Sequence, residues 1–414
     1  MALALCAGAC AAGGDDEPQP PVDNITGNIT LTLRTRAVDN ALSDAASDTE
    51  KMHNLRVVIL SRSGMTGWQV EHNDFVSFNT MKLSDTREYE VKPNSLKRIY
   101  LIANAGNEMA DASGTVRDLS MGINYLPGAD GKALIDNVMF SLPADQGTIS
   151  SLPMSAVYDM NIGPDVEKAS LQAYVVRAVN KLSLTVENNT AAYKDGADRS
   201  QGIWERKIKV LGWKLDGIAK DNYLMPHVNI DGSSYWVADT DRKSTVNLPG
   251  HWSDWLAEEV KKSSAGDIER YQWLTDYELP DDENSIFEYT YTDPQEIGYI
   301  AGSNLFVAPA PVYFHESRNI ADADDPLMLQ QYTFTLVTEE LIDGETQWRH
   351  REYTAVLPQL ASLFRDTHVV VNVNIHLYEI ELKVEEQPYS YVVLEPDFGL
   401  DRDENGNIIV KDKD

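Results

Sequence analysis

The chain has 414 residues, of which 43% are hydrophobic, so it is long enough for two or three globular domains and is not disordered overall. Its 35 basic residues stand against 65 acidic residues, which gives a formal net charge of -30. A chain this acidic lacks the clustered positive charge that phosphate binding needs, and we therefore expect no nucleic-acid partner.

Residues 1–23 predict the remnant of a lipoprotein signal followed by an acidic spacer. The two cysteines of the chain, Cys6 and Cys10, both lie here, so we expect no disulfide in the folded body. Small residues precede Cys10, which makes it the predicted lipidation site, although no basic residue precedes the apolar run. The alternative is a terminal tag of no consequence. No later segment is apolar over the length of a membrane-spanning helix.

A β-strand is predicted from residue 24 to Arg34, because apolar and polar residues alternate strictly. One face carries Ile25, Gly27, Ile29, Leu31 and Leu33. Arg34 and Arg36 follow, and a polar stretch without periodicity separates them from the next strand at 55–60. We expect the arginines on an exposed tether that a trypsin-like protease can cut, with Arg36 favoured. Cleavage would remove Ile29, Leu31 and Leu33 from a core; the alternative is an ordinary surface loop.

Further strands are predicted at 88–91, 97–106, 171–188, 207–218, 310–317, 331–340, 351–357 and 368–384, and short helices at 130–142 and 244–262. The apolar face of the last strand changes near Tyr378, which predicts a bulge or strand switch at 377–379. A polar, Gly/Asp-rich segment at 188–202 places a domain boundary there. The prediction is an all-β chain with two tandem β-sandwich domains, 24–195 and 196–414, and a few short helices.

No enzyme motif is present, and the eight histidines are scattered. We therefore expect neither catalysis nor a cofactor, although a glycoside hydrolase with two distant carboxylates stays open. Three tryptophans, Trp252, Trp255 and Trp273, indicate either a sugar-stacking platform or hydrophobic core.

One local pattern has the spacing of a calcium loop, near the C-terminus. Asp401, Asp403 and Asn405 occupy alternate positions, and Asp412 stands where a bidentate glutamate is usual. The alternative is that Asn405 and the glycine after it form a hairpin turn.

Four segments, in this order, resemble the fimbrillins of the Bacteroidales, the type V pilins. They are IYLIANAG (99–106), VVRAVNKLSLTV (175–186), VYFHESRN (312–319) and LFRDTHVVVNVNI (363–375). Ser317, Asp366 and His368 depart from the residues usual in that family. The resemblance extends over nearly the whole chain from about Cys10.

The resemblance implies two transthyretin-like sandwiches, export as a lipoprotein to the outer membrane, and cleavage by an arginine-specific protease. The first strand is then released, and the C-terminal strand of another subunit fills its place in a cell-surface fimbrium. Apolar segments near the C-terminus supply the candidate donor residues Tyr391, Val393, Ile408 and Val410.

The implied partners are other fimbrial subunits, including tip and anchor proteins, and a glycan or protein receptor on a host. Two alternatives stay open. One is a tip or accessory fimbrial adhesin, and the other is a carbohydrate-binding surface lipoprotein that does not polymerise.

Overall fold

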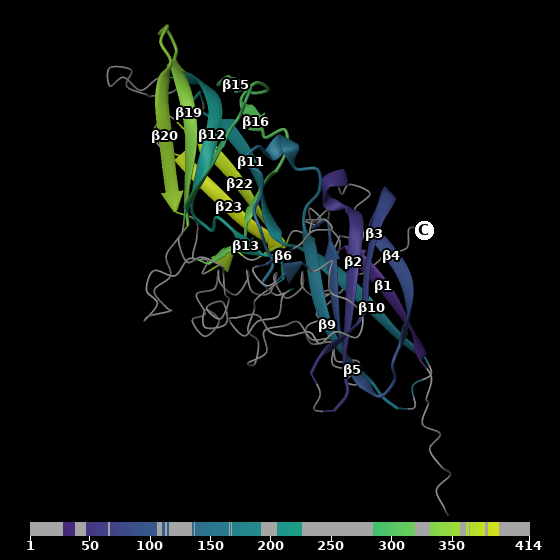
Figure 1. Ribbon diagram of the computed structural model, residues 1–414. Coiled ribbons are helices and arrows are strands. Elements are labelled where there is room, and N and C mark those ends of the chain that lie inside the picture. The colour runs from purple at the N-terminus through teal and green to yellow at the C-terminus, as the bar shows by residue number, and fades with distance from the viewer. Residues whose placement is uncertain are drawn as a thin grey trace, which may run out of the picture.

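The computed structural model describes residues 28–37, 47–64, 67–105, 110–111, 114–115, 135, 137–164, 166, 168–191, 205–225, 285–318, 332–356, 362–363, 365–376 and 380–388. These residues form two β-rich lobes (Figure 1). The helical pieces within them are two 3-10 turns, η1 (Asp48–Glu50) and η3 (Gln146–Thr148). The prediction of an all-β fold is confirmed. In this part of the chain no helix has the length and hydropathy to cross a membrane.

The first lobe is a sandwich of two β-layers. Its strands are β1 (Ile29–Ala37), β2 (Met52–Arg62), β3 (Gln69–Lys82), β4 (Ser84–Val91), β5 (Ser95–Ala103), β9 (Met154–Ile162) and β10 (Lys168–Arg177). They are ordered β3-β2-β5-β9-β10-β1-β4. β9 and β10 pair at two positions only, and at this point the order of strands passes from one layer of the sandwich to the other. The layer β10-β1-β4 faces the layer β3-β2-β5-β9, and one hydrophobic core contains side chains from both.

The second lobe is also a sandwich. One sheet has the order β16-β11-β22-β23, with β17 also paired to β11, and the other has the order β14-β12-β19-β20, with β15 also paired to β12. Its strands are β11 (Val179–Asn188), β12 (Arg206–Ile218), β14 (Ser285–Thr290), β15 (Glu296–Ile297), β16 (Leu305–Val307), β17 (Val312–His315), β19 (Thr333–Ile342), β20 (Arg349–Val356), β22 (Thr367–Ile375) and β23 (Ile380–Pro388). The fully buried Trp213 stacks between Phe287 and Phe334 in its core.

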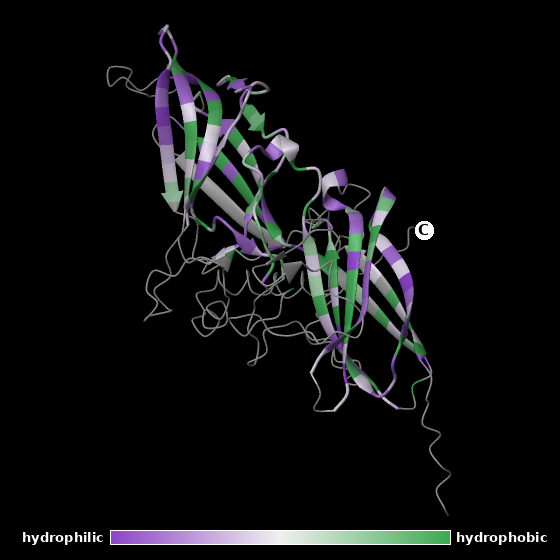
Figure 2. Ribbon diagram, in the orientation of Figure 1, coloured by the Kyte–Doolittle hydropathy of each residue, from purple (hydrophilic) through white to green (hydrophobic). Residues whose placement is uncertain are grey.

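Alternating hydropathy explains the strands of both sandwiches, and Figure 2 shows it as stripes along them. In β22, Val369, Val371, Val373 and Ile375 are buried and the intervening residues are half-buried. The register therefore has one arrangement that buries the apolar face, because a slip of one residue would expose all four side chains.

The chain passes between the sandwiches through Ala178, the single residue between β10 and β11. The buried face changes at this point. Leu171, Ala173 and Val175 enter the first core, whereas Leu182 and Leu184 enter the second. The predicted strand 171–188 is thus two strands, and the expected boundary at 195–196 falls beyond β11, which pairs with strands of the second sandwich.

The segment 368–384 contains a chain reversal instead of the predicted bulge or strand switch. β22 and β23 are antiparallel, with Ile375 opposite Ile380 and Val373 opposite Leu382. The apolar face changes near Tyr378 because Ile375 and Ile380, on either side of it, lie opposite each other in antiparallel strands. A reversal of this length and a one-residue slip produce the same pattern in sequence.

Short strand pairs complete the described part of the fold: β6 (Ala110–Asp111) with β7 (Gly114–Thr115), β8 (Met139–Phe140) with β13 (Asn222–Tyr223), and β18 (Ser317–Arg318) with β21 (Ser362–Leu363). Because β8 lies in the predicted helix 130–142, that prediction is wrong where the segment is described. The predicted helix at 244–262 lies outside the described residues.

Truncating Leu31 should destabilise the first sandwich strongly, because its side chain is fully buried in the core. We expect Leu31→Ala to lower the free energy of unfolding by about 2–5 kcal/mol, measured by urea titration with circular dichroism. The matched control is Thr32→Ala on the opposite face of the same strand, which should cost at most about 1 kcal/mol. Equal effects of the two substitutions would contradict this account of the core.

Candidate functional site

The first strand occupies an interior position in its sheet, between β10 and β4 (Figure 1). It pairs with β10 in parallel, from Thr30 opposite Lys168 to Ala37 opposite Val175. It pairs with β4 in antiparallel fashion, from Ile29 opposite Val91 to Arg36 opposite Ser84. The backbone of β1 is therefore hydrogen-bonded along both edges, and the β1 slot, defined as the space between β4 and β10, is completely filled.

Side chains from β1 also form part of the core of the first sandwich. Ile29, Leu31 and Leu33 are 3%, 0% and 1% exposed, and Thr35 continues the same row at 2%. Burial of an aliphatic side chain contributes about 1.5–3 kcal/mol, so the three together contribute about 5–9 kcal/mol. That sum is comparable to the entire stability of a typical domain. The prediction that these three side chains lie in a core is confirmed.

The two arginines lie inside the strand and not on a tether beyond it. Arg34 stands opposite Thr86 and Gln172, and Arg36 stands opposite Ser84 and Tyr174. The expectation of an exposed tether at these two positions is wrong, because β1 continues to Ala37. Which arginine a protease cuts stays a prediction.

A pocket of about 320 Å³, lined mostly by polar and charged residues, opens where β1 begins. Asn28, Glu71, Glu90 and Lys92 are among the residues that line it. Beside it, the fully buried Lys97 donates from Nζ to Oε2 of Glu71 at 2.5 Å. Burial lowers the pKa of Lys97 although the Glu71 carboxylate opposes this. The entrance to the β1 slot is therefore polar, in contrast to its aliphatic centre.

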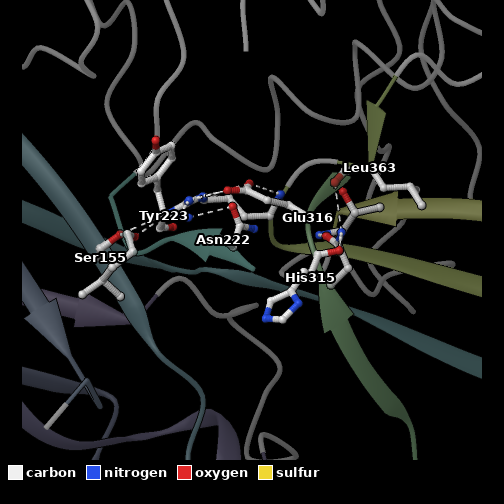
Figure 3. Close-up of polar contacts among 10 residues, drawn as sticks. Ser155, Asn222, Tyr223, His315, Glu316 and Leu363 are labelled. Carbon is white, nitrogen blue, oxygen red and sulfur yellow. Dashed lines mark hydrogen bonds and ion pairs between the residues drawn. The ribbon is translucent and has the colours of Figure 1, made fainter. Parts of the chain in front are cut away.

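A buried ion pair of the second sandwich lies at its junction with the first. Arg365, just before β22, contacts the carboxylate of Glu316 through both its backbone and its guanidinium group, and each side chain is 1% exposed. The same guanidinium donates to the carbonyl oxygens of Tyr223 and Leu224 at 2.9 and 2.7 Å, and to Oγ of Ser155 in β9 at 3.2 Å (Figure 3). One side chain of the second sandwich thus satisfies acceptors on three separate segments.

A second buried polar cluster lies where β10 meets β11. Nη1 of Arg177 is 3.4 Å from Oδ1 of Asp366, and its Nη2 donates to the carbonyl oxygen of Glu50. The Glu50 carboxylate accepts from Nζ of Lys181 and from the hydroxyl of Tyr313, both at 3.3 Å. Because Glu50 belongs to η1, this cluster fixes the first described turn that follows β1 to both sandwiches.

Burial raises the pKa of Asp366 to about 7, because its single contact with Arg177 is too long to offset the loss of hydration. Its Oδ2 atom is buried without a hydrogen-bond partner among the described residues. Nearby in β22, burial and the positive charge of Lys181 lower the pKa of His368 to about 3. Asp366 has a positive φ of 63°, a conformation that aspartate and asparagine tolerate better than most residues.

Asparagine side chains also connect separate segments at the junction. Asn104, with a φ of 61°, donates to the carbonyl oxygens of Lys51 and Leu152 at 2.7 and 2.9 Å. Its Oδ1 atom accepts from the backbone N–H of His53 at 2.7 Å. This one amide therefore fixes the end of β5 against the starts of β2 and β9.

His315 connects two further segments in its neutral form. Nδ1 donates to the carbonyl oxygen of Ala219 at 3.3 Å, and Nε2 accepts from the backbone N–H of Leu142 at 3.1 Å. Burial lowers the pKa of His315 to about 4. Nearby, Asn180 donates to the carbonyl oxygen of Leu363 at 3.0 Å.

The four sequence segments that carry the fimbrillin resemblance therefore meet at the junction. They contribute Asn104, Arg177, Glu316 and Arg365, which are polar residues within or beside apolar strand runs. Sequence reasoning missed this convergence. The available signal was a charged or amide side chain in each otherwise apolar segment, which is unfavourable in a core unless the groups pair.

Several predicted site residues lie outside the described residues: Cys10, Tyr391, Val393, Ile408, Val410, Asp401, Asp403, Asn405, Asp412, Trp252, Trp255 and Trp273. The lipidation, donor-strand, calcium and aromatic-platform predictions therefore stay predictions. Within the described ranges, no group of three or more His, Cys, Asp or Glu side chains has an arrangement that could hold a metal ion.

Replacing Arg365 with methionine should loosen the junction, because it leaves the Glu316 carboxylate buried without its counter-charge. We expect Arg365→Met to reduce the free energy of unfolding by about 3–5 kcal/mol in urea titrations. Arg349→Met is the control, since Arg349 pairs with Glu345 at the surface, and it should leave the unfolding midpoint unchanged. A midpoint for Arg365→Met equal to that of wild type would show that the ion pair does not hold the sandwiches together.

Asp366→Asn should change how stability depends on pH. Because the folded pKa of about 7 lies above the ordinary 3.8, the contribution of Asp366 to stability is complete below about pH 4 and is lost as pH rises through 7. The amide stays neutral throughout, so the variant should exceed wild type by about 2–4 kcal/mol at pH 8 and match it near pH 4.

The measurement for this prediction is a series of urea titrations of both proteins between pH 4 and pH 8. His315 and His368 have lowered pKa values, so their stabilisation is present above pH 6.5 and declines as pH falls through about 4 and 3. Both histidines are common to the two proteins, and the difference between the curves isolates Asp366. A difference that does not vary with pH would contradict the raised pKa.

No protein-family model and no curated protein sequence matches the chain. Among solved structures, a candidate cell adhesion protein from Parabacteroides distasonis superposes with a TM-score of 0.50 at 12% identity, over 89% of this chain and 99% of that protein. A fimbrilin from Porphyromonas gingivalis has a TM-score of 0.45 at 12% identity, with 88% and 98% covered. The tip fimbrial protein Mfa3 from the same species has a TM-score of 0.43 at 12% identity, with 87% and 99% covered.

The match to the Parabacteroides protein extends over both sandwiches and shows that the two chains share a fold. The four sequence segments predict a likeness in fold to Bacteroidales surface proteins, and the match to this cell adhesion protein confirms it.

Proposed function

We propose that this chain is a structural subunit of a bacterial cell-surface fimbrium that supports adhesion and is assembled by strand exchange. The observation that carries the proposal is the place of β1: it is the first described strand of the chain, yet it lies between two other strands and supplies three core side chains. In this proposal the protein is exported as a lipoprotein, cut after β1, and completed by the C-terminal strand of another subunit. It acts as a structural protein and not as an enzyme.

One cleavage after β1 is sufficient to separate it from the other described strands, because all of them follow it in the chain. Loss of β1 would leave facing edges of β4 and β10 unpaired and the apolar interior open. Unpaired edges of this kind recruit an incoming strand, and peptide addition to sheet edges is a common mode of recognition. The cut strand stays in place until another strand replaces it, because its three buried side chains still contribute several kcal/mol.

The pairing of the arginines adds a condition to cleavage. A protease binds its substrate as an extended chain, so the end of β1 must first separate from β4 and β10. Separation from the end at Ala37 back to Arg36 breaks fewer hydrogen bonds than separation back to Arg34. This favours Arg36, in agreement with the prediction from sequence. Strand ends open more readily than strand centres.

The length of the slot limits which donor residues can occupy it together. β1 has nine residues and is therefore about 30 Å long. An extended chain from Tyr391 to Val410 would measure about 60 Å. The slot can thus hold one of the two predicted donor segments and not both, so the second segment would pair elsewhere on the assembly.

Digestion with an arginine-specific protease tests the proposed function. We expect the wild-type precursor to gain a new N-terminus at Ala37 and to form a ladder on a denaturing gel that collapses on boiling. Arg36→Lys should reduce that cleavage at least about tenfold, because each 1.4 kcal/mol lost from transition-state binding slows the reaction tenfold. Edman sequencing and gel densitometry give both measurements.

The matched control is Arg62→Lys, at the exposed end of β2 in the same sandwich. This variant should be cut at Ala37 and should polymerise like wild type. A protein that is cut at Arg36 and stays monomeric would refute assembly by strand exchange and would favour the tip or glycan-binding alternatives.

A further inference from the structure

The strands that border the β1 slot run in opposite directions. Of the nine residues of β1, eight are paired in parallel with β10 and eight are paired in antiparallel fashion with β4. It follows that β4 and β10 are antiparallel to each other. Any strand placed between them is parallel to one neighbour and antiparallel to the other, whichever way it runs.

Backbone pairing therefore gives little preference for strand direction in the slot. Parallel pairing is slightly weaker than antiparallel pairing, but each direction provides one pair of each kind. A reversed strand exchanges which neighbour is the parallel one and keeps the total unchanged. The side chains of the strand in the slot must therefore provide any preference for its sequence or direction.

The side-chain environment of the slot is also similar at its two ends. At the start of β1, Glu71 lines the polar pocket beside Asn28 and pairs with the buried Lys97. At the other end the buried Thr35 lies opposite Asp85 of β4. Between these polar ends lie three consecutive inward positions with aliphatic side chains. An apolar centre with a polar region at each end has nearly the same profile in both directions.

We propose that the β1 slot selects an extended strand by three alternating aliphatic side chains, and that it accepts such a strand in either direction. The inference deepens the proposed assembly function and rests on it for the biological source of the strand. The partner is an extended peptide with aliphatic residues at positions i, i+2 and i+4. Polar residues take the intervening positions, as Thr30 and Thr32 do in β1.

Peptide exchange on the full chain tests this proposal. A site for a sequence-specific protease is introduced between residues 40 and 44, and Leu31→Asn weakens the hold of the chain's own first strand. After nicking, three fluorescent ten-residue peptides compete for the slot: the sequence of residues 28–37, the same sequence reversed, and a forward peptide with Leu31→Asn and Leu33→Asn. Fluorescence anisotropy gives their apparent affinities.

Disulfide trapping reports the direction of each bound peptide. Each peptide carries an N-terminal cysteine, and the protein carries either Lys92→Cys or Ser84→Cys, both at exposed positions near opposite ends of β4. Cys6 and Cys10 are replaced by serine so that only the introduced thiol reacts. The forward peptide should cross-link at position 92, and the reversed peptide at position 84.

We expect the forward and reversed peptides to bind within about tenfold of each other, and the doubly substituted peptide to lose at least about 100-fold. The inference is overturned if the reversed peptide does not bind or cross-links at position 92. It is also overturned if the doubly substituted peptide binds as well as the forward one, or if no peptide displaces the weakened strand. Since the assay uses neither an arginine-specific protease nor the C-terminal segment, its result is separate from that of the polymerisation experiment.

Discussion

The first sandwich depends on a strand being present between β4 and β10. Without one, two sheet edges lose their backbone partners and the apolar interior of the sandwich opens along its length. In the chain as it stands, β1 meets this requirement, and its aliphatic row makes it part of the core. The fold requires that some strand be present, but it places weaker limits on the amino-acid sequence of that strand, because backbone hydrogen bonds carry no sequence information. In the assembly that we propose, this difference would allow one polypeptide segment to substitute for another.

The junction holds the two sandwiches and the turn η1 in fixed positions, whichever strand lies in the slot. Arg365 reaches from the second sandwich to Ser155 on the first, and Glu50 of η1 is held by Lys181 and Tyr313 from strands of the second sandwich. Buried charges of this kind add little net stability compared with apolar residues, but they require specific partners in specific places. The position of η1, which follows β1 in the chain, is therefore set by residues of the second sandwich together with Arg177 at the end of β10.

Local patterns predict the local features of this fold well. The alternation around Leu31 predicts both the strand and its burial, because burial with a period of two is a property of adjacent residues. The end of β1 is harder to place, since nothing in the sequence marks Thr35 as buried. The strand β3 is not predicted from the sequence, because it is largely polar and only partly buried. The ion pair between Glu316 and Arg365 joins residues 49 positions apart, a distance at which periodicity carries no information.

The passage from β10 to β11 through Ala178 has a mechanical consequence. A force that separates the two sandwiches is transmitted along the backbone of these two strands, with the side chains of the junction beside them. β11 is hydrogen-bonded to β22 along eight consecutive register positions, from Lys181 to Asn188, so a pull along β11 loads these bonds together. Resistance to force depends on the rate of unfolding more than on equilibrium stability. In the proposed fimbrium, tension on a subunit would therefore load these strands in shear.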